Sequence, residues 1–567
     1  MDMDTNNLVK ESLESHQPGA TVVPVIVSTD KTLLTQFRDR MAYPIYMTIG
    51  NIPKAIRRKP SHHAQVLIGY IPVTKLAGIS NKTSRRRALA NLFHACMDHA
   101  LGPIRPYGET GVAMMSGDGV WRRCHPVFAV FVGDYPEQAL VACTYNGRCP
   151  KCTVLPEQLG EYETFPPRVP STAIDTFRLA DSDLRRFHVV CHESGLKPVF
   201  HPFWEALPFT NIFVSITPDI LHQMLQGMMK HLIRWVIRIF GAAGVDARCR
   251  VIPPNHRTML FPKGISTLSR VTGKEHKKMC AILLGLIVDL PVPGGHDSSR
   301  ILKAVRSLLD FLYLSQYQCH TSGSITQLEE SLAAFHQFKE VFFDFGVRKH
   351  FKIPKLHSLS HYASSIRMFG TTDNYNTEQS ERLHIDLTKN AYRATNHKDE
   401  YAQMTIWLER REKLQRHVEF INWKQQNYLP GRSWTHTGPP RARSLSPKMA
   451  WHPSSKAVSW DDLHHRYGAV EFQDALADFL AQANNPGLSR RQELRRHAAN
   501  TLIPFCAVPV FHNIKFTDGS TEIVDSVHAR PEQKDTHGRI IPSRFDTALV
   551  QSGPQHGTQA PGIRGES

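Results

Sequence analysis

The sequence predicts an α/β fold whose sheet-and-helix core is interrupted by a large, mainly helical insertion. Two observations predict this class. Apolar, β-branched runs bounded by Pro and Gly gather between residues 21 and 136, and runs with apolar residues at helical spacing dominate residues 154–347. With 567 residues, 41% of them apolar, the chain can bury more than one interior.

Three strands, a helix and a fourth strand are expected, in that order, in the first of these regions. The strands are TVVPVIVST, AYPIYMTIGNI, HAQVLIGYIPV and PVFAVFV, and the helix spans residues 82–101. This is the element order of the ribonuclease H-like fold, in which the first and fourth strands are neighbours. Asp30 follows the first strand and Asp134 follows the fourth, so we expect the two carboxylates to lie together.

Carboxylates clustered at strand ends suit phosphoryl transfer. Two divalent cations roughly 3.5–4 Å apart activate the attacking oxygen and stabilise the leaving one, and carboxylates are the hard ligands that such cations prefer. A single Asp at a strand end is more often a turn or cap residue, so the arrangement indicates catalysis more than either residue does. Asp118 is the alternative to Asp134, but the Gly on each side of it indicates a hairpin turn.

One close cysteine pair and one close histidine pair predict a metal site. Cys149 and Cys152, in NGRCPKC, can place two thiolates on one ion, and His357 and His361, in HSLSH, are spaced to share a face of a helix. Together they make a candidate Cys₂His₂ site. The rival ligands are Cys191 with His192, and His222 with His231.

The charge balance predicts a polyanionic partner. The chain has 68 Lys and Arg against 51 Asp and Glu, a net charge of +17, which favours nucleic acid through counterion release. The cluster at residues 82–87 is more often a solvated helix face. The candidate phosphate contacts are Arg57, Arg58, Lys59, Arg122 and Arg123. No apolar run reaches the ~18 residues of a membrane span, and no signal peptide is evident, so we expect an intracellular protein.

Longer strings in the same order resemble the Plavaka transposase family of fungal DNA transposons, which is related to the Kyakuja, Dileera and Zisupton elements. The resemblance covers residues 22–411, with a weaker tail to about residue 531. The strings that carry it include VSTDKT, YPIYMTIGNIPKAIRRKPS, GDGVWRRCHPVFAVFVGDYPEQALVAC, PDILHQMLQGMMKH, IPKLHSLSHY and FGTTDNYNTEQSERLHIDLTKNAYRATNHKDEYAQMTIWLERRE.

The resemblance implies a DDE transposase on a ribonuclease H-like core. The triad carries over as Asp30, Asp134 and Glu381, which would hold Mg²⁺ or Mn²⁺ for phosphodiester hydrolysis and strand transfer. Glu378, one turn before Glu381, is the alternative third carboxylate. Double-stranded DNA, at transposon ends and target, is the implied partner, the nucleus is the implied location, and a homodimer is a possible assembly.

A more distant similarity to Transib transposases and the V(D)J recombinase concerns the order of metal ligands. Those proteins place a C-x-x-C after the second Asp and a His pair before the catalytic Glu, with zinc joining the two ends of a helical insertion. The similarity implies a structural Zn²⁺ held by Cys149, Cys152, His357 and His361.

The expected organisation has a disordered N-terminus at residues 1–20, core halves at 21–148 and 351–428, the C-x-x-C and helical insertion at 149–350, a linker and small C-terminal region at 429–531, and an irregular, disordered tail at 532–567. Asp30 lies thirty residues from Met1, which leaves little room for an upstream DNA-binding module. The alternative function is therefore a truncated or domesticated transposase derivative that binds DNA or protein without catalysis.

Overall fold

The computed structural model describes residues 19–36, 39–116, 119–253, 259–427, 446–450, 452–485, 491–517, 523–534, 540–541 and 543–545. These residues fall in two units, Met1–Leu429 and Pro430–Ser567, each described by itself. Within the described residues, no helix combines the length and the apolar character needed to cross a membrane. Most of the predicted N-terminus and tail lies outside the described residues.

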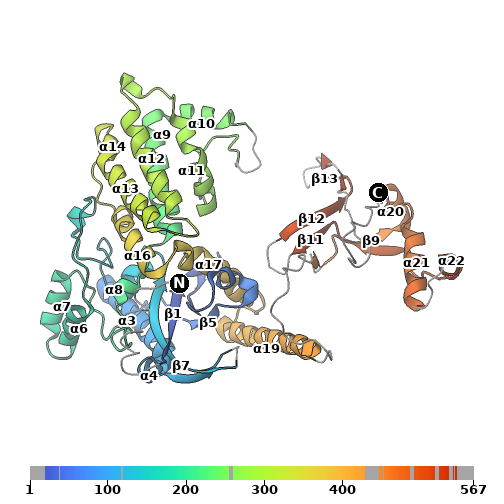
Figure 1. Ribbon diagram of the computed structural model, residues 1–567, viewed down its shortest axis with the longest axis horizontal. Coiled ribbons are helices and arrows are strands. Elements are labelled where there is room, and N and C mark those ends of the chain that lie inside the picture. The colour runs from blue at the N-terminus through green and yellow to red at the C-terminus, as the bar shows by residue number, and fades with distance from the viewer. Residues whose placement is uncertain are drawn as a thin grey trace. The chain divides into compact units, whose positions relative to one another are not determined.

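The first unit is an α/β unit built on a mixed sheet (Figure 1). Among the described residues the sheet has five strands in the order β5-β4-β1-β7-β6. They are β1 (Thr21–Thr29), β4 (Pro44–Ile49), β5 (Val66–Tyr70), β6 (Val112–Met115) and β7 (Trp121–Val132). Strand β1 pairs parallel with β7 and antiparallel with β4, while β5 and β6 pair antiparallel with their neighbours. The predicted adjacency of the first and fourth strands is confirmed.

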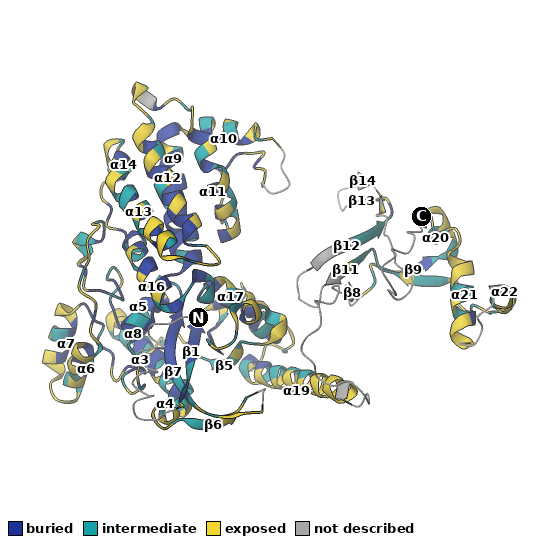
Figure 2. Cartoon of the chain, viewed as in Figure 1, coloured by how far each residue is buried: buried dark blue, intermediate teal, exposed yellow. Residues whose placement is uncertain are grey.

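Both faces of β1 are covered, which explains its continuous apolar run. Val25 and Val27 belong to a core cluster with Phe93 of α3 (Lys82–Leu101), whose bounds match the prediction. Ile26 points to the other face, where it packs in a cluster with Tyr375. Figure 2 shows that much of β1 and β7 is buried. A segment late in the chain is therefore packed on the sheet that begins the chain.

A helical region follows the sheet strands, as the apolar spacing predicts. A large core cluster of this region includes Leu232, Leu283, Leu308 and Leu328. Its helices are α5 (Tyr135–Val141), α6 (Pro170–Arg178), α7 (Leu184–Glu193), α8 (Ile212–Ser215), the π-helix η6 (Ile220–Met229), α9 (Lys230–Phe240), α10 (Ala242–Arg250), α11 (Gly273–Ile287), α12 (Ser299–Leu314), α13 (Ser322–Phe338) and α14 (Val341–Asp344).

The chain then returns to the sheet and ends the first unit in a long helix. The elements of this return are α15 (Pro354–His357), the 3-10 turn η8 (Ser358–His361), α16 (Tyr362–Phe369), α17 (Thr377–Leu383), the π-helix η10 (His384–Lys389), α18 (Asn390–Arg393) and α19 (Glu400–Asn427). Short elements earlier in the chain are β2 (Thr32–Thr35), β3 (Arg40–Ala42), α2 (Lys54–Arg57) and α4 (Arg105–Thr110).

The second unit contains short strands and three helices within its described residues. Its strands form the order β15-β12-β11-β8 and the pairs β10-β9 and β13-β14. The strands are β8 (Ser446–Met449), β9 (Ser455–Ser459), β10 (Ala507–Val510), β11 (Asn513–Thr517), β12 (Ile523–Arg530), β13 (Gln533–Lys534), β14 (Ile540–Ile541) and β15 (Arg544–Phe545), and the helices are α20 (Trp460–His465), α21 (Phe472–Asn484) and α22 (Arg491–Ala499).

The buried side chain of His94 on α3 should make the first unit less stable in acid. Burial lowers the pKa of His94 from 6.5 to about 4, so the unfolded chain binds this proton more readily than the folded protein does. Neutral His94 makes its full contribution to the free energy of unfolding above pH 6.5. This contribution, roughly 3 kcal/mol, is lost as the pH falls from 6.5 toward 4. Urea unfolding followed by circular dichroism at several pH values measures this loss.

The matched variants are His94→Gln and His62→Gln. The Nε2 atom of His94 lies 3.0 Å from the Leu140 carbonyl oxygen, and Gln keeps a donor there without titrating. We expect His94→Gln to flatten the fall in unfolding free energy between pH 6.5 and 4, and the exposed His62→Gln to leave it unchanged. Equal pH dependence in wild type and His94→Gln would contradict this account.

Candidate active site and metal centre

Asp30 and Asp134 lie at one edge of the sheet, because β1 and β7 are parallel neighbours whose ends Ser28 and Val132 are in register. Asp134 caps α5, where its Oδ1 accepts from the Glu137 backbone N–H at 3.0 Å. Burial, and after it the negative charges of Asp134 and Glu381, raise the pKa of Asp30 to about 6, although the charge of His222 acts in the opposite direction. Asp134 and Glu381 are therefore both close enough to act on the Asp30 carboxylate.

Glu381 reaches this edge from α17. Its Oε1 lies 3.1 Å from His222 Nε2. The Glu378 carboxylate instead accepts a hydrogen bond from Asn376 Nδ2 at 3.1 Å, at the start of the helix. Of the two, Glu381 contacts His222, and the choice between them as the third carboxylate stays a prediction. The other alternative, Asp118, lies outside the described residues.

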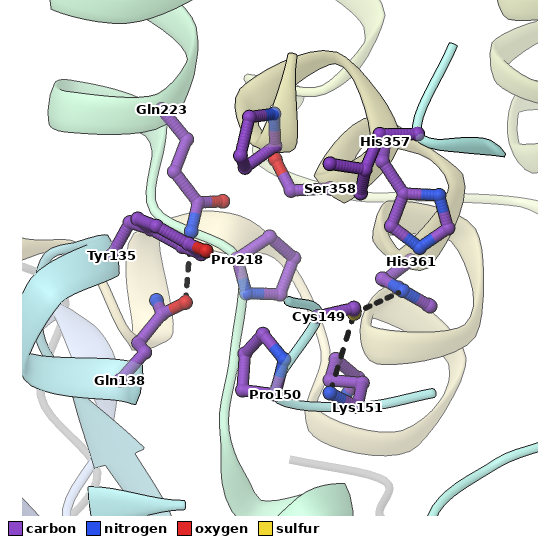
Figure 3. A pocket seen from close by; sticks show the side chains of 12 residues that line it. Tyr135, Gln138, Cys149, Pro150, Lys151, Pro218, Gln223, His357, Ser358 and His361 are labelled. Carbon is purple, nitrogen blue, oxygen red and sulfur yellow. Dashed lines mark hydrogen bonds between the residues drawn. The ribbon is translucent and has the colours of Figure 1, made fainter. Parts of the chain in front are cut away.

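A network around Asp219 holds α17 in place. Asp219 caps η6, and its buried Oδ1 accepts from the backbone N–H and the hydroxyl of Thr377, at 3.2 and 2.8 Å. Its Oδ2 accepts from the backbone N–H of His222 at 2.7 Å and lies 2.9 Å from His222 Nδ1. Gln223 adds a link to the helix that Asp134 caps, because its Nε2 donates to Gln138 Oε1 at 2.8 Å (Figure 3).

His222 is thus bridged between two carboxylates. Burial lowers its pKa, but hydrogen bonds to Asp219 and Glu381 outweigh this effect and raise the pKa to about 10. At neutral pH both ring nitrogens therefore carry protons and donate. The sequence places Asp219 and His222 three residues apart at a helix start, and this D-x-x-H spacing is the signal that could have assigned them a role.

Glu137 is a further carboxyl that sequence reasoning missed. It accepts hydrogen bonds from Thr29 Oγ1, at 2.9 Å, and from the Tyr43 hydroxyl. Burial raises the pKa of Glu137 to about 7. These bonds join the end of β1 to the start of α5, and so fix Asp30 and Asp134 relative to each other.

Arg57, one of the predicted DNA contacts, is instead buried within the first unit in this structure. Arg57 is only 3% exposed, and it donates to the backbone oxygen and the Oδ1 of Asn374 at 3.2 and 2.9 Å. Lys54, one turn earlier, donates to Thr371 Oγ1 at 2.7 Å and pairs with Asp373 at 3.0 Å. Helix α2 therefore supports the segment that leads into α17. Lys54 and Arg57 have a structural role there.

The other predicted DNA contacts lie nearer the surface. Arg58 and Arg123 are exposed, whereas Lys59 and Arg122 are half-buried. Arg123 donates to the Thr110 backbone oxygen at 3.1 Å, and Arg122 donates to the Ser116 hydroxyl. A role of these four residues in DNA binding stays a prediction.

Cys149, Cys152, His357 and His361 converge from the two ends of the helical region. Their ligand atoms all lie within 4.8 Å of one another, and no other group of three or more Cys, His, Asp or Glu within the described residues meets this condition. Cys149 Sγ lies 3.2 Å from His361 Nε2, and Cys152 Sγ lies 3.1 Å from His357 Nε2. Figure 3 shows Cys149 and the two His side chains directed toward one another.

The expected single helix face for the two His residues needs a correction. His357 ends α15, and His361 ends the 3-10 turn η8, so the helix tightens between them. Both imidazoles still reach the cysteines. Two sulfur and two nitrogen donors at this spacing are a donor set that suits tetrahedral zinc.

Basic residues fix the C-x-x-C loop. Lys151 Nζ donates to the backbone oxygens of Phe213, Val214 and Ile216, at 3.2, 3.0 and 2.6 Å, around the end of α8. Arg168 Nε donates to the Cys149 backbone oxygen at 2.9 Å. Burial lowers the pKa of Lys151 to about 8. Nearby cations favour the thiolate form that binds metal.

The rival ligands are engaged elsewhere. His222 contacts Glu381, and His231 stacks on Trp235 with ring centroids 5.9 Å apart. Cys191 is buried in the core cluster beside α3, and His192 lies against Tyr145.

By its fold and site, this is an α/β protein that carries carboxylates at the ends of adjacent parallel strands and a Cys₂His₂ cluster nearby. The family model of the Plavaka transposase matches residues 1–236, so the Plavaka resemblance is confirmed over this range. The match indicates a transposase. It includes Asp30, Asp134 and His222, while Glu381 lies beyond it. No curated protein matches the chain.

Zinc content tests the metal centre directly. We expect about one zinc per chain in the purified protein and little in Cys149→Ser, because three ligands left in a buried site bind the ion much more weakly. The exposed Cys319→Ser is the matched control and should keep its zinc. Elemental analysis after dialysis measures the stoichiometry. Full zinc content in Cys149→Ser would reject the site.

Proposed function

We propose that this protein is a DNA transposase of the DDE class, with Asp30, Asp134 and Glu381 as its triad on a ribonuclease H-like core. The observation that carries the proposal is that Asp30 and Asp134 follow two adjacent parallel strands, with Glu381 near enough to help raise the pKa of Asp30. The family match over residues 1–236 supports it.

The sheet order supports a ribonuclease H-like core. Three antiparallel strands, β1, β4 and β5, precede helix α3, and β7 then inserts parallel to β1. Beyond β7, Phe131 bridges in parallel to Ile216, which precedes η6. The side of β7 that pairs with β6 near its start thus accepts, near its end, a further parallel segment close to Asp134.

The three carboxylates offer the oxygen ligands that hard divalent cations such as Mg²⁺ or Mn²⁺ prefer, although their oxygens do not converge as closely as the donors of the Cys₂His₂ cluster do. Burial and, after it, the charges of Asp134 and Glu381 raise the pKa of Asp30, and a bound cation would favour the ionised carboxylate against both effects. When bound, two such ions supply the positive charge that activates an attacking water or 3′-hydroxyl and stabilises the leaving oxygen of the phosphodiester. Asp30 and Asp134 offer their oxygens from rigid strand ends, and Glu381 offers its oxygens from α17.

His222 acts in this proposal as a positioning residue. It donates one ring N–H toward Asp219 and the other toward Glu381, which fixes the rotamer of the Glu381 side chain. Lys355 supports it by donating from Nζ to the His222 backbone oxygen at 2.8 Å. Asp219 therefore sets both the start of α17 and, through His222, the direction of its carboxylate.

The Cys₂His₂ cluster is proposed to hold a structural Zn²⁺. All four donors come from the protein, which is typical of structural rather than catalytic zinc. The cluster joins the segment that follows Asp134 to the segment that precedes Glu381, so the ion would keep the third carboxylate beside the first two.

The substrates proposed are the transposon ends and a double-stranded target DNA, and the proposed location is the nucleus. The net charge of +17 supports a DNA partner. A homodimer is proposed as the assembly that would hold two ends. The experiment below also decides between this enzyme and a non-catalytic, domesticated derivative.

Glu381→Gln should abolish metal-dependent cleavage, because an amide cannot replace the negative ligand charge. Glu378→Gln is the matched control from the same helix and should retain most of the activity. Nicking of supercoiled plasmid DNA, with Mg²⁺ or Mn²⁺, is the assay. Both variants should keep DNA binding and zinc. Cleavage by Glu381→Gln would remove this residue from the triad, and absence of nicking in the wild type would favour the non-catalytic derivative.

His222→Ala should lower the nicking rate about 10–100-fold, the usual effect of losing a residue that orients a metal ligand. We also expect a higher Mg²⁺ concentration for half-maximal rate, because Glu381 would be less well oriented. A titration of rate against Mg²⁺ measures both effects. A merely structural role would lower the amount of folded protein and leave the Mg²⁺ midpoint unchanged.

A further inference from the structure

A hollow opens beside Glu381, between the helical region and α17. Its volume is about 990 Å³, and three parts of the chain line it: η6 with α9, residues 265–279, and α17 with Ile385 of η10. Glu378, Glu381 and Arg382 form the side contributed by α17. We call this hollow the cationic groove.

Lys and Arg side chains outnumber acidic ones in the lining of the groove, five to two. They are Lys230, Arg234, Arg270, Lys274 and Arg382, and each is exposed. Arg382 pairs with Asp386 at 3.0 Å, whereas the other four have no carboxylate within salt-bridge distance in the described part of the chain. The acidic residues of the lining, Glu378 and Glu381, both belong to α17.

The positive charges of the groove lie close enough together to act on one side chain of its wall. Burial lowers the pKa of His276 in the groove wall, and the charges of Lys230 and Arg234 lower it further. Arg270 has a backbone φ of 55°, in the left-handed region that non-glycine residues rarely adopt. Such backbone conformations cluster at binding and catalytic sites.

The groove also has apolar surface between its cations. Ile237, Leu268 and Val271 are among the residues that supply it. Bases or sugars can pack on apolar surface while phosphates meet Lys and Arg, which is how sequence-tolerant binding of single strands works. A volume near 990 Å³ is that of a cavity for a compact ligand, and suits a few nucleotides of one strand rather than a duplex.

We propose that the cationic groove binds a single DNA strand and leads it to Glu381. The inference rests on the proposed function, because the strand is taken to run toward the active site. A strand lying against Lys230, Arg234 and Lys274 would continue past Glu381. It adds a binding site for an unpaired strand, separate from the predicted duplex contacts Arg58, Lys59, Arg122 and Arg123.

Two double variants with equal charge change test the groove. Lys230→Glu with Lys274→Glu alters the groove, whereas Arg238→Glu with Lys277→Glu alters exposed residues of the same two helices that do not line it. Both are made in the Glu381→Gln protein without added Mg²⁺, so binding is measured apart from cleavage. The probes are a labelled, mixed-sequence single-stranded DNA and the same sequence as a blunt duplex, and circular dichroism confirms folding.

We expect the groove variant to bind the single strand about tenfold more weakly, and its salt slope to fall by about 0.7 for each phosphate that it no longer neutralises. The control should bind like its parent. Equal weakening in the two variants, or weakening confined to the duplex, would overturn the inference. If the wild type fails to nick DNA but the groove variant alone releases the single strand, the proposed function falls and the groove stands.

Discussion

The buried carboxylate of Asp219 is the interaction on which the geometry around Glu381 depends. It is 1% exposed and serves four donors, two from Thr377 and two from His222. A buried carboxylate is stable only when its oxygens are satisfied in this way. Because the donors belong to the starts of η6 and α17, neither helix can shift without leaving a charge unpaired. The contact between the helical region and the Glu381 helix therefore centres on one side chain.

Other contacts repeat this connection at different places. Arg57 and Lys54 tie the segment before α17 to the sheet side of the unit, and the Cys₂His₂ cluster ties the C-x-x-C loop to the turn after α15. These links use different chemistry, namely cation to amide, cation to carboxylate and sulfur to imidazole. Each link fixes a separate point in the segment that precedes Glu381. This segment is therefore held at several places along its length.

Much of the sheet and each of the two close ligand pairs could be predicted from local sequence patterns, whereas the joining of the two pairs into one site was implied by the resemblance in ligand order. The β-branched runs indicated β1, β4, β5 and β7, and the close spacing of Cys149 with Cys152 and of His357 with His361 indicated metal ligands. What could not be predicted depends on distant partners. A basic run does not reveal that Arg57 is buried against Asn374, and a D-x-x-H spacing does not reveal that His222 meets Glu381. The π-helical winding of η6 was not predicted either.

The pairing of Cys152 with His357 closes a stretch of 205 residues. The entropic cost of closing a loop grows only with the logarithm of its length, at about 0.6 kcal/mol for each doubling. Once the two ends are fastened, residues can be inserted or deleted between them at small thermodynamic expense. The length of the exposed loops within this stretch is therefore only weakly constrained by the closure itself, whereas its helices are constrained by the core that they share.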